Sequence, residues 1–213
     1  MNTSRKRFAV VAVAAALTIA SGCARHAVLN VVPPAASNAP GAVTSVEHLK
    51  GYSATTLRLL LWWADLPEAV HVEHGVDLYR IKYWTTNYDD TPVLASGLVS
   101  IPRKAAPKGV VSYQHGTNPT RSLAPSKPTL GEGVIGSAVF AGGWYLFVAP
   151  DYIGLGASTE LHPYFNTKST VASVVDCLRA ARACCDGLKI KWPDSVFLTG
   201  FSQGGHATIA VHK

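Results

Sequence analysis

A motif near the C-terminal end of the sequence has the residue types and spacing of a nucleophilic serine. Gly-Phe-Ser-Gln-Gly lies between a strand-like run, Val196–Thr199, and a helix-like run, His206–Val211. A sharp strand-to-helix turn raises the serine hydroxyl above the sheet and requires small residues two positions before and after it. The helix N-terminus also favours developing negative charge. We therefore predict that Ser202 is a nucleophile for acyl transfer, with Gly200 and Gly204 as the elbow glycines.

A second motif, Gln-His-Gly-Thr at residues 114–117, fits the other requirement of acyl transfer. This chemistry needs two backbone N–H groups directed at the oxyanion. One is expected from Gln203, which follows the nucleophile, and the other from the loop after an earlier strand, at Thr117 or Gly116. We expect His115 to brace this loop rather than to act as the catalytic base.

The elements that must position these residues follow from the hydrophobic periodicity. Period-two alternation around Tyr79–Tyr83 and the run Val93–Ile101 predict an antiparallel hairpin. Later strands and helices alternate, with strands at Gly109–Gln114, Trp144–Ala149 and Val196–Thr199, and helices at Glu132–Ala141, Val171–Ala181 (capped by Ser169 or Thr170) and His206–Val211. An earlier helix is expected at Thr55–Ala64. This order predicts an α/β fold, a mostly parallel sheet with helices on both faces and an N-terminal antiparallel hairpin.

Three ordered motifs resemble the secretory lipase family of α/β-hydrolases: residues 114–117, Ala149–Gly156 and Gly200–Gly205. The resemblance runs from about Val76 to the C-terminus. It implies the α/β-hydrolase fold and a serine-dependent lipase or esterase that cleaves carboxylic esters of lipids or short acyl groups. It maps the nucleophile onto Ser202 and the oxyanion loop onto His115–Thr117. The mechanism needs no metal and no organic cofactor.

Two further residues would lie near this site, at the end of a neighbouring strand. They are Asp151 and Tyr152, within the second motif. We expect Asp151 to be structural rather than catalytic.

The sequence departs from the resemblance in one respect. The triad acid and histidine of this fold follow the serine along the chain, but no Asp or Glu follows Ser202. His206 and His212 lie along the following helix, where neither can serve as the base. We therefore expect the base and the acid to lie beyond Lys213. Residues 46–213 are then expected to be the N-terminal portion of an α/β-hydrolase domain whose C-terminal part is missing. We expect this chain alone to be inactive.

Two other functions are compatible with the same residues. A serine peptidase of the prolyl-oligopeptidase type shares the elbow and the strand order. A non-catalytic α/β-hydrolase-like lipoprotein would use the scaffold for binding only. Both stay open at this point.

The N-terminal residues have the pattern of an export signal. Basic residues at positions 5–7 precede an apolar stretch, Phe8–Ala20, so residues 1–22 are expected to be a signal peptide. Ala20–Cys23 resembles a bacterial lipobox, which predicts lipidation of Cys23; an ordinary cleaved signal is the alternative. Residues 23–45, which contain three prolines, are expected to be a flexible tether. The protein would then be exported and lipid-anchored to the bacterial cell envelope, at the outer membrane or the periplasmic face.

Composition limits the classes of partner. Of 213 residues, 48% are hydrophobic and 15% charged, and the net charge of +6 falls to +3 without the leader's three basic residues. Basic residues are not clustered among aromatics, so we expect no nucleic acid partner. A small-molecule or lipid ester and a membrane contacted through the anchor are the expected partners.

No metal-ligand spacing occurs, and we expect buried thiols at Cys177, Cys184 and Cys185, or pairing with a cysteine beyond Lys213.

Overall fold

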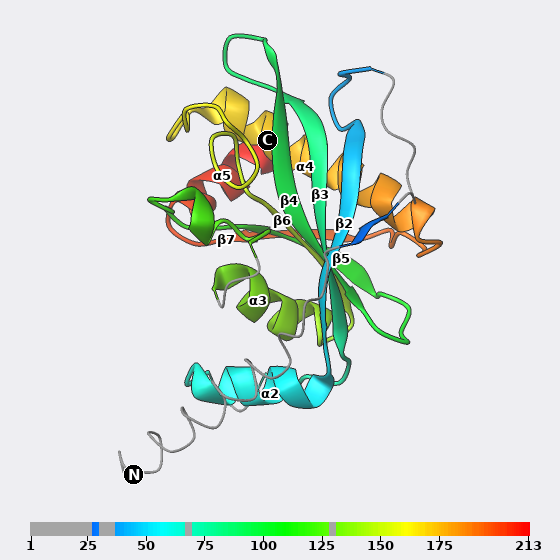
Figure 1. The fold of residues 1–213 in the computed structure, drawn as a ribbon. Coiled ribbons are helices and arrows are strands. Elements are labelled where there is room, and N and C mark those ends of the chain that lie inside the picture. The colour runs from blue at the N-terminus through cyan, green and yellow to red at the C-terminus, as the bar shows by residue number, and fades with distance from the viewer. Residues whose placement is uncertain (1–26, 30–36, 67–69, 128–130) are drawn as a thin grey trace.

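The computed structural model describes residues 27–29, 37–66, 70–127 and 131–213. These residues form one seven-stranded sheet in the order β1-β2-β3-β4-β6-β5-β7, with α4 and α5 on one face and α2 and α3 on the other (Figure 1). The strands are β1 (Ala27–Leu29), β2 (Val43–Tyr52), β3 (Val76–Thr86), β4 (Pro92–Pro102), β5 (Gly109–Gln114), β6 (Tyr145–Pro150) and β7 (Val196–Gly200). The helices are α2 (Ala54–Trp63), the short η1 (Arg121–Leu123), α3 (Glu132–Gly136), its π-helical continuation η2 (Ser137–Ala141), α4 (Thr167–Gly187) and α5 (Gln203–His212).

The predicted α/β class, the hairpin and the helices on both faces are confirmed, but the expected mostly parallel pairing is wrong for the described strands. Strands β1 to β4 form an antiparallel meander, and β4 pairs with β6 in antiparallel orientation. Only β5 with β6 and β5 with β7 are parallel. The meander outweighs the parallel part because β1 and β2 extend the predicted hairpin.

Strand β2 was not predicted, and it corrects the expected extent of the tether. Its buried residues, Val43, Val46, Leu49 and Tyr52, recur every three positions instead of every two. Val43 and Val46 pack on the α4 face and Leu49 and Tyr52 on the α2 face, and a register shift against β3 allows the two members of each pair to share a face. Residues 27–29 and 43–45, placed in the tether by the sequence, therefore belong to the sheet; positions 23–26 and 30–36 lie outside the described residues.

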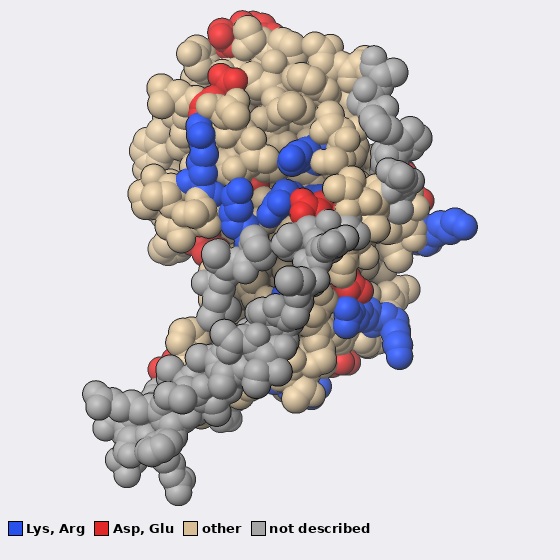
Figure 2. All heavy atoms as spheres, viewed as in Figure 1, with Lys and Arg blue, Asp and Glu red and all other residues tan. Residues whose placement is uncertain are grey.

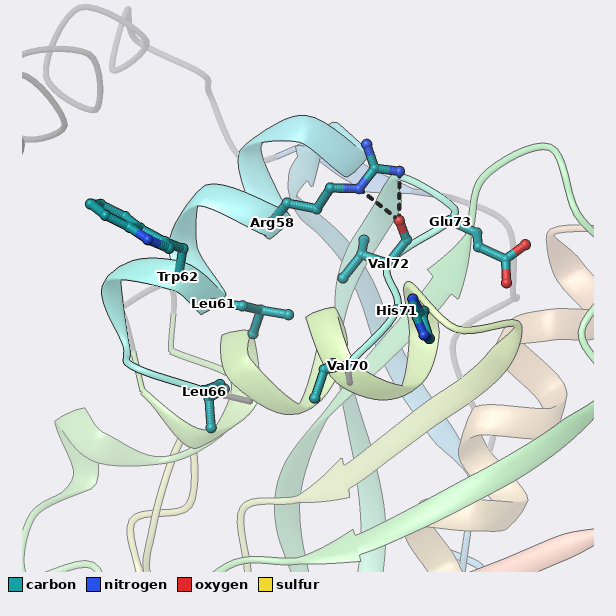
Figure 3. Close-up of a pocket in the computed structure, with 8 residues that line it drawn as sticks. All are labelled: Arg58, Leu61, Trp62, Leu66, Val70, His71, Val72 and Glu73. Carbon is teal, nitrogen blue, oxygen red and sulfur yellow. Dashed lines mark hydrogen bonds between the residues drawn. The ribbon is translucent and has the colours of Figure 1, made fainter. Parts of the chain in front are cut away.

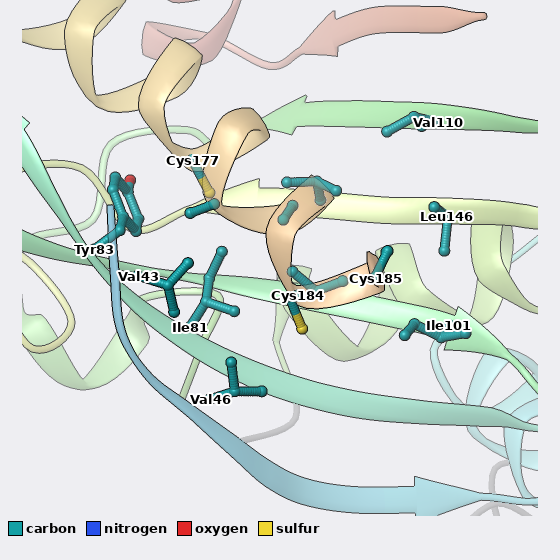
Figure 4. Packing of buried hydrophobic residues seen from close by; sticks show 14 of the residues in the cluster. Val43, Val46, Ile81, Tyr83, Ile101, Val110, Leu146, Cys177, Cys184 and Cys185 are labelled. Atoms are coloured by element: carbon teal, nitrogen blue, oxygen red, sulfur yellow. The ribbon is translucent and has the colours of Figure 1, made fainter. Parts of the chain in front are cut away.

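Helix α4 covers one face of the sheet and carries the three cysteines of this domain on the side that packs against the strands (Figure 4). Cys177, Cys184 and Cys185 are buried free thiols against β-strand residues such as Ile81, which confirms the expected burial. Burial raises the pKa of all three, that of Cys184 to about 12. These thiols therefore act as small apolar side chains.

The start of α4 is one turn earlier than predicted. Asn166 caps the helix, and its side chain accepts a hydrogen bond from the Ser169 amide at 3.1 Å. Ser169 and Thr170, the expected caps, are buried inside the first turn. An asparagine before Thr167 is as good a cap signal as a serine, so the error lies in choosing between adjacent polar residues.

The opposite face is covered by α2, α3 and η2. Leu57 and Leu60 of α2 are buried in a cluster with Phe147 of β6, which confirms that this apolar helix packs onto the domain.

Within the described residues no helix is both long and apolar enough to cross a membrane. On the visible face, basic side chains lie near acidic ones (Figure 2). The predicted signal peptide and the predicted lipidation site, Cys23, lie outside the described residues.

Candidate active site

The predicted turn between β7 and α5 has the backbone of a nucleophile elbow. Ser202 is exposed and has φ 54° and ψ −116°, a conformation that side chains rarely adopt. A Cβ on Gly200 would overlap the carbonyl of Gly204, and one on Gly204 would overlap the carbonyl of Gln114. Both glycines are therefore required by close backbone packing, as the motif indicated.

The end of β5 holds the elbow in place. Gln114 is the register partner of Gly200, and its carbonyl accepts a hydrogen bond of 3.2 Å from the Phe201 amide. The Gln114 side chain is buried below the turn, 2.9 Å from the Thr208 hydroxyl of α5. Because β5 and β7 are parallel neighbours, the loop after β5 lies beside Ser202.

Two backbone amides near Ser202 are available for an oxyanion. Gln203 is the first residue of α5, whose leading N–H groups have no partner within the helix. The Gly116 amide is already engaged, because it donates a hydrogen bond of 3.3 Å to the Glu132 carboxylate. No such bond engages the Thr117 amide among the described residues. This leaves Gln203 and Thr117 as the candidate pair; their role stays a prediction.

His115 braces the loop after β5, as the sequence analysis expected. It is fully buried, with Nδ1 2.6 Å from the Gly116 carbonyl and Nε2 3.2 Å from the Asp151 carbonyl. The contact to Asp151 is to the backbone and not to the carboxylate. No described contact joins His115 to Ser202, so the two do not form a base–nucleophile pair here.

Asp151 and Tyr152 support the loops around the site. The buried Asp151 carboxylate accepts a hydrogen bond of 2.8 Å from the Ser126 amide, and hydroxyl bonds from Ser126 and Ser96. Tyr152 is buried, and its ring lies 4.3 Å from the His115 ring, centroid to centroid. Burial raises the pKa of its hydroxyl. Both residues hold the loops together and are away from solvent.

The described residues do not assemble a base for Ser202, whose hydroxyl has no hydrogen-bond partner among them. The His206 ring packs against Phe165 at 5.0 Å, and His212 lies near the outer side of β7. The described part of the chain also has no group of three or more His, Cys, Asp or Glu side chains that could hold a metal ion.

Sequence reasoning missed two residues beside the site, His162 and Tyr164. His162 lies 3.2 Å from the Gln203 side chain, and the Tyr164 hydroxyl lies 2.9 Å from the Thr117 hydroxyl. Both belong to a loop without hydrophobic periodicity. The only available signal was a His-Pro-Tyr run shortly after the second motif.

A pocket beneath α2 is unrelated to this site (Figure 3). Its volume is about 400 Å³, and its lining includes Leu61, Trp62 and Val70. Residues 73 and 74 bond to the Gly142 carbonyl, ahead of β6, so the pocket lies at the amino end of the parallel strands. Ser202 follows the carboxyl end of β7, at the opposite edge of the sheet.

No family model and no curated protein matches the chain. Among solved structures, a Legionella pneumophila protein proposed to be a hydrolase is 32% identical with a TM-score of 0.74, over 79% of this chain and 46% of that one. The rice cell wall degrading esterase LipA of Xanthomonas oryzae is 27% identical with a TM-score of 0.71, over 81% and 45%. Candida antarctica lipase A, at 18% identity and a TM-score of 0.53 over 89% and 41%, shows the fold alone.

The fold is that of lipase-like and esterase-like α/β-hydrolases. The chain spans slightly less than half the length of these structures. They do not distinguish the secretory lipase family from other hydrolases of this fold.

Proposed function

We propose that the protein is a serine hydrolase that cleaves carboxylic esters through an acyl-enzyme on Ser202. The main support for this proposal is the positive φ of Ser202, which lies at a strand-to-helix turn closed by Gly200 and Gly204. Strained backbone of this kind is kept where it exposes a reactive group. The similarity to LipA, an esterase, favours the same reaction class.

In the proposed reaction, the Ser202 oxygen attacks the acyl carbonyl carbon while a histidine base takes the hydroxyl proton. The Gln203 and Thr117 amides donate to the oxyanion. The base then returns the proton to the leaving alcohol, and water attacks the acyl-enzyme to release the acid. We propose that the base and its orienting acid come from outside residues 1–213, since no described histidine bonds to Ser202.

Apolar side chains around the elbow favour an ester with an apolar acyl group. Phe201 is 66% exposed, and Tyr164 and Phe165 are about half exposed. Exposed aromatic residues beside a nucleophile form a surface that an acyl chain can cover. We therefore propose a small-molecule or lipid ester as the substrate.

Fluorophosphonate labelling of the full-length protein tests this function. Wild-type protein should be labelled, Ser202→Ala should not, and Ser122→Ala, at another exposed serine, should react like the wild type. We expect ester hydrolysis to fall by about 10⁴-fold or more in Ser202→Ala. Absence of labelling in the wild type would favour a binding protein, and faster turnover of Xaa-Pro amides than of esters would favour a peptidase.

We also propose that Cys23 carries a lipid that anchors the exported protein to the cell envelope. The lipobox-like run Ala20–Cys23 after an apolar stretch supports this. Labelling with radioactive palmitate should mark the wild type and not Cys23→Ala. Equal label in both would refute the anchor.

A further inference from the structure

One loop segment, Leu161–Phe165, touches both sides of the candidate oxyanion site. It lies between β6 and α4, in the yellow loop beside α5 in Figure 1. Leu161 is 90% exposed, whereas His162 is half-buried. Some side chains of the segment are therefore anchored while others face solvent.

His162 joins this segment to the residue after the nucleophile. Its Nδ1 lies 2.7 Å from the Ile153 carbonyl oxygen, which can only accept, so Nδ1 carries the proton and donates. Nε2 is then the acceptor for the Gln203 side-chain nitrogen at 3.2 Å. Among the described residues this is the single hydrogen bond of the buried Gln203 side chain, whose Oε1 has no partner. His162 therefore holds the first residue of α5.

Tyr164 joins the same segment to the other side of the site. Its hydroxyl lies 2.9 Å from Oγ1 of Thr117, in the loop after β5. The Tyr164 amide donates to the His162 carbonyl at 2.9 Å, and the two rings pack edge to face at 5.9 Å. One tight turn therefore contacts both candidate oxyanion residues.

The segment has its own support outside the oxyanion site. Gly154 has φ +83°, and a Cβ there would overlap the His162 backbone, so this glycine allows close packing. Arg121 donates to the carbonyl oxygens of Gly154, Thr159 and Glu160 at 2.9 to 3.0 Å. These bonds fix the loop that leads into the segment.

We propose that His162 and Tyr164 are positioning residues that set the separation of the Gln203 and Thr117 amides. The inference rests on the proposed function and deepens it, because it assigns the control of oxyanion binding to one loop. The oxyanion forms only on the way to the acyl-enzyme, so a changed amide separation lowers kcat and leaves KM nearly unchanged. A misplacement of about 1 Å can lower a rate about 100-fold.

A double-mutant cycle on Tyr164 and Thr117 in the full-length protein tests the inference, with p-nitrophenyl butyrate as substrate. Tyr164→Phe removes only a hydroxyl, and Thr117→Val replaces Oγ1 while keeping the backbone amide. Each variant should lower kcat about fivefold with KM within about twofold, and the double variant should lose no more than either one. Leu161→Ala, in the same segment, should match the wild type.

A second variant tests the other contact. His162→Asn keeps a donor for the Ile153 carbonyl but loses the acceptor for Gln203, so kcat should fall about tenfold. Additive losses in the double-mutant cycle, or a wild-type kcat in His162→Asn, would overturn the inference while leaving the proposed function intact. No turnover by the wild type would instead refute the proposed function, and the inference with it.

Discussion

The interior of the sheet and its β7 edge are held in place by different forces. In the interior, β6 lies between β4 and β5, and Leu146, Phe147 and Val148 are fully buried under helices on both faces. At the edge, β7 is paired only with β5 among the described strands, and Val196 is 44% and Phe197 51% exposed. The candidate nucleophile lies at this less buried edge.

The elbow turn itself is held by backbone contacts, whereas α5 behind it packs Ala207 against Tyr152 and Val174. Interior strands are positioned by close-packed side chains, which resist any change of volume. The elbow is positioned by backbone: Gly204 against the Gln114 carbonyl, and the Phe201 amide bonded to that carbonyl. The two regions should therefore respond differently to small substitutions.

The largest effect is expected from adding one methyl group at the elbow. Gly204→Ala places a Cβ into the Gln114 carbonyl, and neither backbone can move freely. We expect the free energy of unfolding to fall by about 3 kcal/mol or more and labelling of Ser202 to be lost. Urea unfolding and fluorophosphonate labelling measure the two effects.

The neighbouring glycine provides the matched control. A Cβ on Gly205 would meet nothing closer than the Gly200 carbonyl at 4.0 Å. Gly205→Ala should therefore be neutral or stabilise helix α5 by up to about 1 kcal/mol. Equal losses from both alanines would show that the elbow is sensitive to any substitution and not to the Gln114 contact.

A second pair of substitutions compares the interior of the sheet with its β7 edge directly. Val148→Ala in β6 removes a fully buried side chain, whereas Val196→Ala in β7 removes one that is 44% exposed. We expect losses of about 2 to 3 kcal/mol at Val148 and less than about 1 kcal/mol at Val196. Urea unfolding of both variants gives the difference. A loss at Val196 as large as at Val148 would mean that another part of the protein covers β7.

The same contrast explains what the sequence could predict. Strands β5 and β7 were predicted because their apolar runs are continuous and end in recognisable motifs. Strand β2 was missed because its buried residues change from one sheet face to the other and its two bulges interrupt the alternation, which leaves a spacing of three that resembles neither a regular strand nor a helix. The apolar pattern of β5 and β7 is local to each strand, whereas that of β2 depends on its pairing with β3.

Within the candidate site, some residues could likewise be located from the sequence and others could not. Ser202 and the two elbow glycines could be located because one short turn fixes their conformation. The contacts of His162 with Gln203 and of Tyr164 with Thr117 join residues 41 and 47 positions apart. Such contacts depend on how separate loops pack, so residue spacing carries no sign of them.

The smallest predicted effect is a loss of stability at acidic pH through His162. Burial is the main cause that lowers its pKa below the ordinary 6.5; the Ile153 carbonyl opposes this, and nearby His115 adds to it. The rings of Tyr152 and Tyr164 and the Gln203 amide complete its surroundings. Between the unfolded and the folded pKa, the unfolded chain binds the extra proton. This contribution to stability is therefore complete above about pH 6.5 and is lost as the pH falls through the folded pKa.

Urea unfolding from about pH 7.5 to about pH 5 measures this effect. The free energy of unfolding of His162→Asn should depend less steeply on pH than that of the wild type, whereas Leu161→Ala should keep the wild-type slope. Protonated Nε2 would become a donor, so the Gln203 amide would have to rotate and present its unpaired Oε1 in place of its nitrogen. An unchanged slope in His162→Asn would contradict this prediction and mean that the folded protein tolerates the charged ring.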